Sequence, residues 1–246
     1  MSLKTELAHF VCHEVQNSED RNFFKEPLVG FASASDPLFL RLPEIVGKHH
    51  IQPQDILPSA RTAMAFFVPF APFVVSANRE PPVAREWAEA YVKANALINS
   101  TCEKVIAFLA GKSVEAAAIP ATHTYDSETL LASWSHRSVG FIAGLGRFGL
   151  NRMLITAKGC AGRYGSLVFA EDVAPDERSE KELCIGLSTG KCRYCLNACP
   201  VDALSPNGLE RHKCNDLLLE NSGRFTELGL CDVCGKCAAG PCAFFA

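Results

Sequence analysis

A dense run of cysteines near the C-terminal end is the feature that most constrains this chain. Of its 12 cysteines, all but three lie between Cys184 and Cys242. In a reducing compartment such clustering argues against disulfides and favours metal ligands, because thiols stay free there. We therefore expect this segment to bind metal.

The spacing within the run indicates which metal centre to expect. Cys192, Cys195 and Cys199 are followed by Pro200, which gives C-x2-C-x3-C-P. This is the latter part of the bacterial 4Fe–4S run C-x2-C-x2-C-x3-C-P. The complete run would begin with a cysteine at the position of Thr189. Cys184 fills that role if residues 185–191 form a longer loop.

A second group of cysteines follows, and the two groups together predict two 4Fe–4S clusters. In such proteins the cysteine before proline serves the other cluster. We assign cluster 1 to Cys184, Cys192, Cys195 and Cys242, and cluster 2 to Cys199, Cys214, Cys234 and Cys237. Cys231 remains as an alternate ligand that exchanges places with Cys237.

Structural zinc is the alternative for the same residues, because zinc sites also use C-x2-C pairs. The remaining cysteines, which are scattered along the chain, are expected to be buried and inert thiols: Cys12, Cys102 and Cys160.

The chain before the cysteine run alternates apolar strands and helical patterns. Periodicity and turn residues predict helices at residues 3–16, 83–111 and 127–139, and strands at 62–68, 114–119, 153–156 and 166–170. Residues 30–42 are expected to be mostly loop, and the charged stretch 174–182 to be a linker. We therefore predict an α/β (α+β) domain over 1–175 and a two-cluster bacterial ferredoxin-like domain over 176–246.

Composition excludes several classes of function. Hydrophobic residues make up 48% and charged residues 21%, which argues against disorder, and the net charge of -3 gives no excess of positive charge for nucleic acid. The longest apolar stretch, at 63–75, is too short for a bilayer, and the first residues lack a signal-peptide core. We expect a cytoplasmic protein with no membrane and no nucleic-acid partner.

A glycine-rich turn precedes the expected strand at 153–156. Gly144, Gly146 and Gly149 match G-x-G-x-x-G. A dinucleotide-binding turn opens a helix and is followed by an acidic residue about 20 positions later. The residues after Gly149 are instead typical of a strand, so the motif alone does not favour a dinucleotide site.

More residues fit a different family. The run Ala-Gly-Leu-Gly-Arg-Phe-Gly-Leu-Asn at 143–151, then Leu-Ile-Thr at 154–156 and Tyr-Gly-Ser at 164–166, resembles the epoxyqueuosine reductases and the related reductive dehalogenases. The resemblance implies that the α/β domain binds a cobalamin, which the clusters reduce. It places Gly144, Gly146 and Gly149 against the corrin, and Asn151 at the corrin edge.

The resemblance also suggests proton donors. Asp126 is the nearest match to the aspartate that epoxyqueuosine reductases carry ahead of the glycine turn, and Tyr125 is a donor by analogy with the dehalogenases. The basic and aromatic features expected for a tRNA anticodon arm are not evident.

The sequence thus predicts an iron–sulfur oxidoreductase. Single electrons from a redox partner protein would pass through two 4Fe–4S clusters to a cofactor such as cobalamin, or to a small-molecule substrate. One alternative is a non-catalytic electron carrier or reductive activator of a corrinoid protein. Another is a zinc-stapled interaction module. Substrate, electron donor and oligomeric state are not specified by the sequence.

Overall fold

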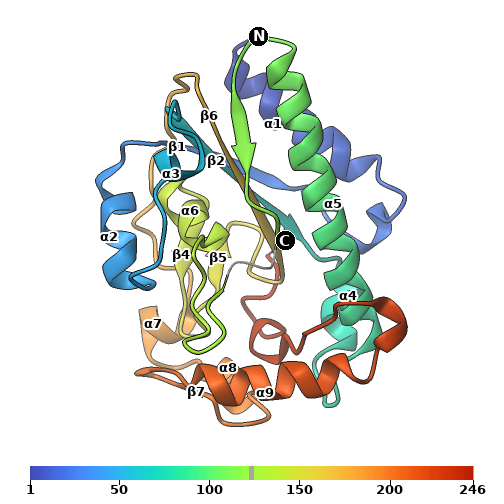
Figure 1. The fold of residues 1–246 in the computed structure, drawn as a ribbon. Coiled ribbons are helices and arrows are strands. Elements are labelled where there is room, and N and C mark those ends of the chain that lie inside the picture. Colours follow the sequence, from blue (N-terminus) through green and yellow to red (C-terminus); the bar gives the residue numbers. More distant parts are fainter. Residues whose placement is uncertain (122–124, 246) are drawn as a thin grey trace.

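A central antiparallel sheet organises the chain. The computed structural model describes residues 1–121 and 125–245 (Figure 1). Four strands pair in the order β1 (Leu28–Ser33), β2 (Thr62–Pro69), β6 (Gly162–Phe169) and β3 (Ala116–Ala118). Every neighbouring pair is antiparallel. Two small sheets, one pairing β4 (Gly146–Phe148) with β5 (Leu154–Thr156), complete a mixed α/β fold.

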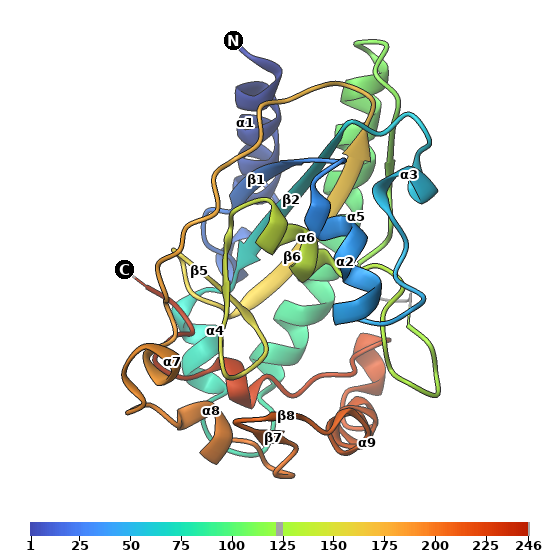
Figure 2. The same cartoon turned by 90° about the vertical axis from the view of Figure 1, so that its left-hand side faces the viewer.

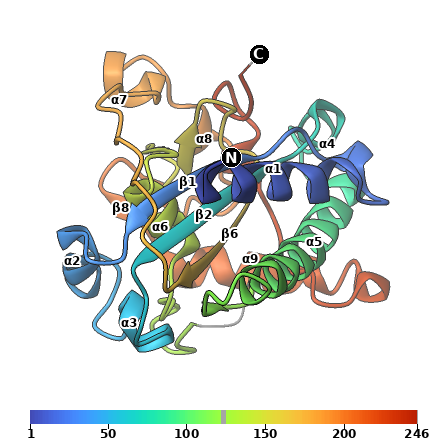
Figure 3. The same ribbon diagram turned by 90° about the horizontal axis from the view of Figure 1, so that it is seen from above.

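Helices cover both faces of the sheet, as seen from above in Figure 3. One face carries α1 (Leu3–Gln16) and α5 (Arg85–Ala110), and the other carries α6 (His136–Ile142) and α2 (Pro37–Ile45). Strand β2 explains the two layers, because successive side chains of a strand point to opposite faces. Met64 and Phe66 enter the core beneath α5, whereas Ala63 and Ala65 enter the core around Trp134.

Helix α5 is the longest element and confirms the helix expected at 83–111. Its buried face repeats every three or four residues, as an amphipathic helix requires. That face comprises Trp87, Tyr91, Ala94, Ile98, Cys102, Val105 and Leu109. The helix at 3–16 and the strands at 62–68 and 114–119 are also confirmed, with small shifts at their ends. Two short helices, α3 (Pro53–Ile56) and α4 (Pro72–Ala77), lie in connections.

The expectation of a helix at 127–139 was wrong. The Asp126 carboxylate accepts the backbone N–H groups of Glu128 and Thr129, which holds those residues in a turn. Helix α6 begins only at His136, where the Ser135 side chain accepts the N–H of Ser138. Competition by such local side-chain acceptors delays the helix.

Two strands were not predicted from the sequence. Residues 28–33 form β1, although a loop was expected over 30–42, and part of the expected glycine turn is strand β4. The strands expected at 153–156 and 166–170 exist as β5 and β6, but they belong to different sheets.

The linker expected at 174–182 has no helix or strand, but hydrogen bonds and ion pairs hold it against the rest of the chain. The N–H of Asp176 donates to the Phe31 carbonyl over 2.8 Å, and the Phe31 N–H donates to the Asp176 carboxylate over 3.0 Å. Lys4 pairs with Asp176 at 2.6 Å, and Arg178 pairs with Asp36 at 2.6 Å. The linker therefore runs along the edge of the sheet at β1.

The cysteine-rich segment lies at one end of the sheet (Figures 1 and 2). Its elements are short: α7 (Ile185–Thr189), α8 (Tyr194–Asn197), β7 (Leu204–Ser205), β8 (Gly208–Leu209), α9 (Arg211–Ser222), and 3-10 turns at Thr226–Leu228 and Lys236–Ala238. The division at residue 175 and the ferredoxin-like character of this segment stay predictions.

Part of the cysteine-rich segment packs against α5. Gly235 lies so close to the Trp87 ring that a Cβ atom there would be 2.1 Å from a ring carbon. The Tyr91 hydroxyl, one turn further along α5, donates to the Asp232 carboxylate over 2.7 Å. Across the described ranges 1–121 and 125–245, no helix combines the length and apolarity needed to cross a bilayer.

Replacing Gly235 with alanine should destabilise this contact. Gly235 has φ of +70°, and a left-handed residue with a side chain costs roughly 1–2 kcal/mol. The clash with Trp87 adds an overpacking cost of about 1–3 kcal/mol. We expect a clear fall in the urea midpoint under anaerobic conditions.

Gly190→Ala is the matched control, because Gly190 has φ of +69° but no atom within 4 Å of its Cβ position. It should show only the backbone cost. Equal losses in the two variants would contradict the contact with Trp87.

Candidate functional site: two facing groups of cysteines

The first cysteine group comprises Cys184, Cys192, Cys195 and Cys242. Cys184 caps α7, Cys195 lies in α8, and all four line one cavity together with Cys237, Leu150, Asn151, Ile185, Tyr194 and Pro241. Burial, and then the thiols of Cys242, Cys184 and Cys192, raise the pKa of Cys195 to about 11. The structure therefore brings together the four residues predicted for cluster 1.

The second cysteine group comprises Cys199, Cys214, Cys234 and Cys237. Burial, then Cys234 and Cys199, raise the pKa of Cys214 to about 11. Burial is also the main cause that raises the pKa of Cys237 to about 12, followed by the other three members and Cys195. Cys237 thus lies between the two groups.

Cys231 stands apart from both groups. It has 0% exposure, and its Sγ atom lies 3.9 Å from the Ala88 carbonyl of α5. Burial raises its pKa to about 11, with smaller contributions from Asp232 and Glu227. These contacts give Cys231 a packing role, and its role as an alternate ligand stays a prediction.

No three His, Cys, Asp or Glu side chains converge on a single metal ion in the part of the chain that the structure describes. The cysteines are arranged as two open groups instead. Structural zinc stays an untested alternative.

A buried lysine lies beside the second cysteine group. Lys236 is 2% exposed, and its Nζ donates to the Asn78 carbonyl and side chain, both at 2.9 Å. It also donates to the carbonyls of Glu80, at 2.6 Å, and Pro82, at 2.8 Å. All these acceptors are neutral, and burial lowers the pKa of Lys236.

A buried ammonium is costly unless negative charge lies near it. Lys236 forms no ion pair with a carboxylate among the residues 1–121 and 125–245. In sequence it stands between Cys234 and Cys237. Thiolates that hold an iron–sulfur cluster would supply the missing negative charge, so the lysine fits such a group.

Asn151 lies beside the first cysteine group. It is 4% exposed, and its Nδ2 donates to the Cys237 carbonyl over 3.2 Å. The same nitrogen lies 3.5 Å from the Cys160 sulfur and 3.8 Å from the Cys242 sulfur. Hydrogen bonds to cluster sulfurs are one determinant of reduction potential. The structure therefore gives Asn151 a position at the cysteines.

The three glycines predicted to face a corrin are packed against protein. A Cβ atom on Gly144 would lie 2.6 Å from the Glu177 carbonyl in the linker. One on Gly146 would lie 2.0 Å from the Ile155 carbonyl, and one on Gly149 would lie 2.6 Å from the Ile155 side chain. These contacts leave no room for a side chain, which explains why all three positions are glycine. The role of the three glycines at a corrin stays a prediction.

The two predicted proton donors lie beside residues 122–124, which the structure does not describe. Tyr125 is 52% exposed. The Asp126 carboxylate accepts the Thr129 N–H at 2.7 Å and the Thr129 hydroxyl at 2.8 Å, and these bonds lower its pKa. A lowered pKa keeps Asp126 ionised at neutral pH, where it accepts a proton more readily than it donates one.

Arg137, which the sequence analysis missed, belongs to a small cluster of basic side chains. Arg137 is exposed, and its guanidinium donates to the Arg152 carbonyl at 3.0 Å. Burial of the guanidinium and the charge of Arg163 lower its pKa, whereas Tyr164 and then the Cys237 thiol raise it. The Arg163 guanidinium in turn lies 4.4 Å from the centre of the Tyr91 ring. We define the basic cluster by Arg137, Arg163 and His136.

His136, the third member of the basic cluster, is uncharged at neutral pH. Burial is the main cause that lowers the pKa of His136 to about 4. Its Nδ1 lies 2.7 Å from the Ser166 hydroxyl, which also accepts from Trp134. His136 and Arg137 are neighbours in α6 but Arg163 comes from β6, so no local spacing could have revealed the basic cluster.

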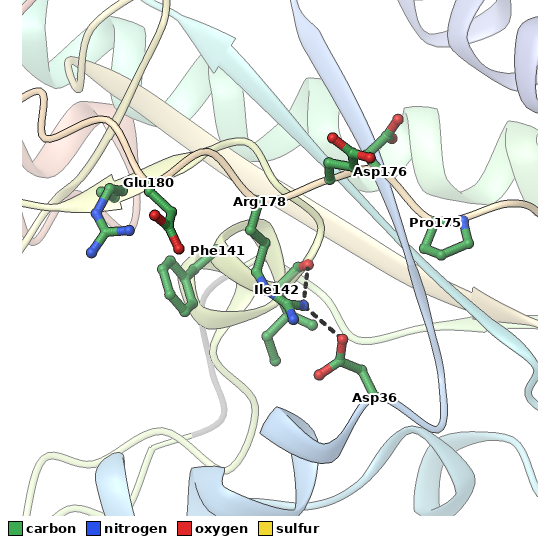
Figure 4. Close-up of a pocket in the computed structure, with 9 residues that line it drawn as sticks. Asp36, Phe141, Ile142, Pro175, Asp176, Arg178 and Glu180 are labelled. Carbon is green, nitrogen blue, oxygen red and sulfur yellow. Dashed lines mark hydrogen bonds and ion pairs between the residues drawn. The ribbon is translucent and has the colours of Figure 1, made fainter.

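A second hollow, of about 540 Å³, lies beneath the linker (Figure 4). Figure 4 shows Arg178 pointing toward the Asp36 carboxylate and the Ile142 carbonyl, with Phe141 and Glu180 nearby. Its lining contains no cysteine among the described residues. The hollow shares no lining residue with the cavity of the first cysteine group.

Comparisons with known proteins show which solved structures share this fold. No family model matches the chain, and no curated protein matches its sequence. A selenomethionine-labelled epoxyqueuosine reductase structure matches 99% of this chain and 67% of its own, at 20% identity and a TM-score of 0.62. The chain has the fold of the epoxyqueuosine reductases. The resemblance inferred from the glycine turn is confirmed at that level.

Two further structures define how far the similarity extends. Epoxyqueuosine reductase from Bacillus subtilis, with its catalytic aspartate loop swung out of the active site, matches 88% of this chain at 20% identity and a TM-score of 0.56. This chain spans 56% of that protein's length. A catabolic reductive dehalogenase matches 72% of this chain and 23% of its own, at 14% identity and a TM-score of 0.52.

Removing the buried positive charge should lower the reduction potential of a cluster held by the second cysteine group. In Lys236→Met, the nearby cation that favours the reduced, more negative cluster is lost. We expect a lower midpoint potential in an EPR-monitored redox titration. Some loss of stability should accompany it, because buried acceptors lose their donor.

Lys213→Met is the matched control for charge. Lys213 adjoins Cys214, but its side chain is 55% exposed and paired with Glu210. Solvent screens such a charge, so its removal should leave the potential nearly unchanged. Equal shifts in both variants would contradict a special role for burial.

Asn151→Asp should lower the potential of a cluster at the first cysteine group. The substitution keeps the side-chain shape but replaces an N–H donor near the Cys242 sulfur with a carboxylate oxygen. The same EPR titration, resolved for the two clusters, should show the larger shift at the first. A shift confined to the second cluster would contradict this placement.

Proposed function

We propose that this chain is an iron–sulfur oxidoreductase in which two 4Fe–4S clusters pass single electrons to an acceptor bound by the α/β part. One observation carries the proposal: the two cysteine groups adjoin at Cys237, which lines the cavity of the first group and interacts with the other members of the second. The fold shared with epoxyqueuosine reductases and a reductive dehalogenase agrees with this class of activity.

The residues around the cysteines suit clusters of this kind. The first group surrounds a cavity, and the second has a buried ammonium with only neutral partners. When bound, the clusters would supply one-electron transfer. The chain itself would bury the thiolates, balance their charge with Lys236 and donate a hydrogen bond from Asn151 toward the Cys242 sulfur.

Electrons would enter from a redox partner protein near the first group. Ile185 and Leu187, which directly follow Cys184 in α7, are 43% and 50% exposed. Exposed apolar side chains close to a ligand offer a docking point. The same feature would serve the alternative function, a non-catalytic electron carrier or reductive activator.

The basic cluster favours a reductase over a carrier, because a reductase needs polar groups beside a cluster that can bind its acceptor. Arg137 is close enough to Cys237 for the thiol to affect its pKa, and neither Arg137 nor Arg163 forms an ion pair with a carboxylate in the described part of the chain. We propose that the acceptor is a small molecule carrying negative charge. The dehalogenase structure cited above contains 3-bromo-4-hydroxybenzoic acid, which is an anionic molecule of that size.

Cobalamin is the more specific acceptor that the family resemblance implies. The residues predicted to bind it have other partners here: Gly144 the linker, Gly146 and Gly149 the hairpin at Ile155, and Asn151 the cysteines. They do not form a corrin cradle, so we derive no step through a corrin. The titration with hydroxocobalamin described below tests whether the protein binds cobalamin.

Anaerobic purification followed by iron and sulfide analysis tests the proposal. We expect about eight irons per chain, as two 4Fe–4S clusters require. Optical titration with hydroxocobalamin would then distinguish a corrin acceptor from another one. Zinc in place of iron would overturn the proposal, because the protein would then be a zinc-stapled module.

A further inference from the structure

Cys160, which lies outside the C-terminal run of cysteines, is adjacent to the first cysteine group. The Cys160 sulfur is 3.7 Å from the Cys242 sulfur, and Cys160 has 0% exposure. It comes from the loop between β5 and β6, far from the cysteine run in sequence. We expected Cys160 to be an inert buried thiol, but its place next to a proposed ligand gives it a different chemical setting.

The backbone holds the two cysteines side by side. The Cys160 N–H donates to the Cys242 carbonyl over 3.0 Å, and the Ala161 N–H donates to the Ala243 carbonyl over 2.9 Å. Gly159 makes the approach feasible: it has φ of +94°, and a Cβ atom there would lie 2.3 Å from the Ala243 carbonyl. Backbone hydrogen bonds between residues 160–161 and 242–243 thus bring the two sulfurs close together.

Both sulfurs also share one polar neighbour. The Asn151 amide nitrogen lies 3.5 Å from the Cys160 sulfur and 3.8 Å from the Cys242 sulfur. A single N–H donor can therefore serve whichever sulfur carries negative charge. The other thiols outside the two groups lack this position: Cys231 contacts Ala88, Cys102 lies within α5 and Cys12 lies within α1.

We propose that Cys160 is an alternate ligand of the first cluster and exchanges with Cys242. This inference rests on the proposed function, since it requires a cluster at the first group. In the exchange, the iron–sulfur bond to Cys242 breaks and one to Cys160 forms. The Cys160 proton moves to the released Cys242 thiolate, so charge and electron count are unchanged.

Four variants test the proposal by iron content and EPR spectra of anaerobically purified protein. Cys160→Ala and Cys242→Ala should each keep about eight irons per chain, because the other cysteine completes the site. The double variant should keep about half. Cys195→Ala, which removes a ligand with no neighbouring substitute, should also keep about half and serves as the control.

Cys242→Ser keeps the size of the side chain and covers the case in which the alanine variant does not fold. Its first-cluster EPR signal should match the wild type when Cys160 is present and change when Cys160 is also replaced. Loss of half the iron from folded Cys242→Ala, or full iron in the double variant, would overturn the exchange. Wild-type protein without iron would overturn the proposed function instead.

Discussion

The cost of burying thiol groups as thiolates underlies the architecture of the cysteine-rich segment. Burial raises the pKa values of Cys195 and Cys214 to about 11, and that of Cys237 to about 12. Without a metal these groups would remain neutral thiols at pH 7. A metal that binds thiolates displaces their protons, so metal binding and folding are coupled. Apart from α9 the elements of the segment are short, so contacts with the α/β part contribute much of its remaining stability.

The α/β layers supply the rigidity that this segment lacks. Trp87 and Tyr91 on α5 contact Gly235 and Asp232, while the loop after α4 surrounds the Lys236 ammonium. Asn78 joins these contacts, since its side chain donates to the Cys234 carbonyl and accepts from Lys236. The α/β part thereby holds residues 232–236, beside the second cysteine group, in place.

Local patterns in the sequence predicted some features well. The period of α5 and the unbroken apolar run of β2 specified those elements, because each is decided by burial along one segment. The cysteine spacing grouped the same thiols that the structure brings together, since ligands to one centre often come from one tight turn. The structure places Cys231, the spare residue of that assignment, outside both groups.

Other features depend on contacts between distant segments and were not predictable in the same way. The Asp126 turn displaced the expected helix, because a side-chain acceptor outcompeted helical hydrogen bonds. Arg137 and Arg163 come close enough for their charges to interact only because α6 and β6 pack together. Asn151 follows the glycine turn in sequence, and its amide lies near the Cys160 and Cys242 sulfurs only because distant segments pack there; its place at a corrin edge stays a prediction.

The pairing of residues 159–161 with 242–243 has a consequence for maturation. The backbone of Cys242 is held by a loop of the sheet, so the first cysteine group is complete only after β5 and β6 are in place. A metal delivered to this group would therefore meet a chain in which the loop between β5 and β6 is already in place. The second group draws its cysteines from residues 199–237 and does not need that loop, but its Cys234 and the adjoining Lys236 are held by Asn78, which follows α4. Each group thus depends on a different contact with the α/β part.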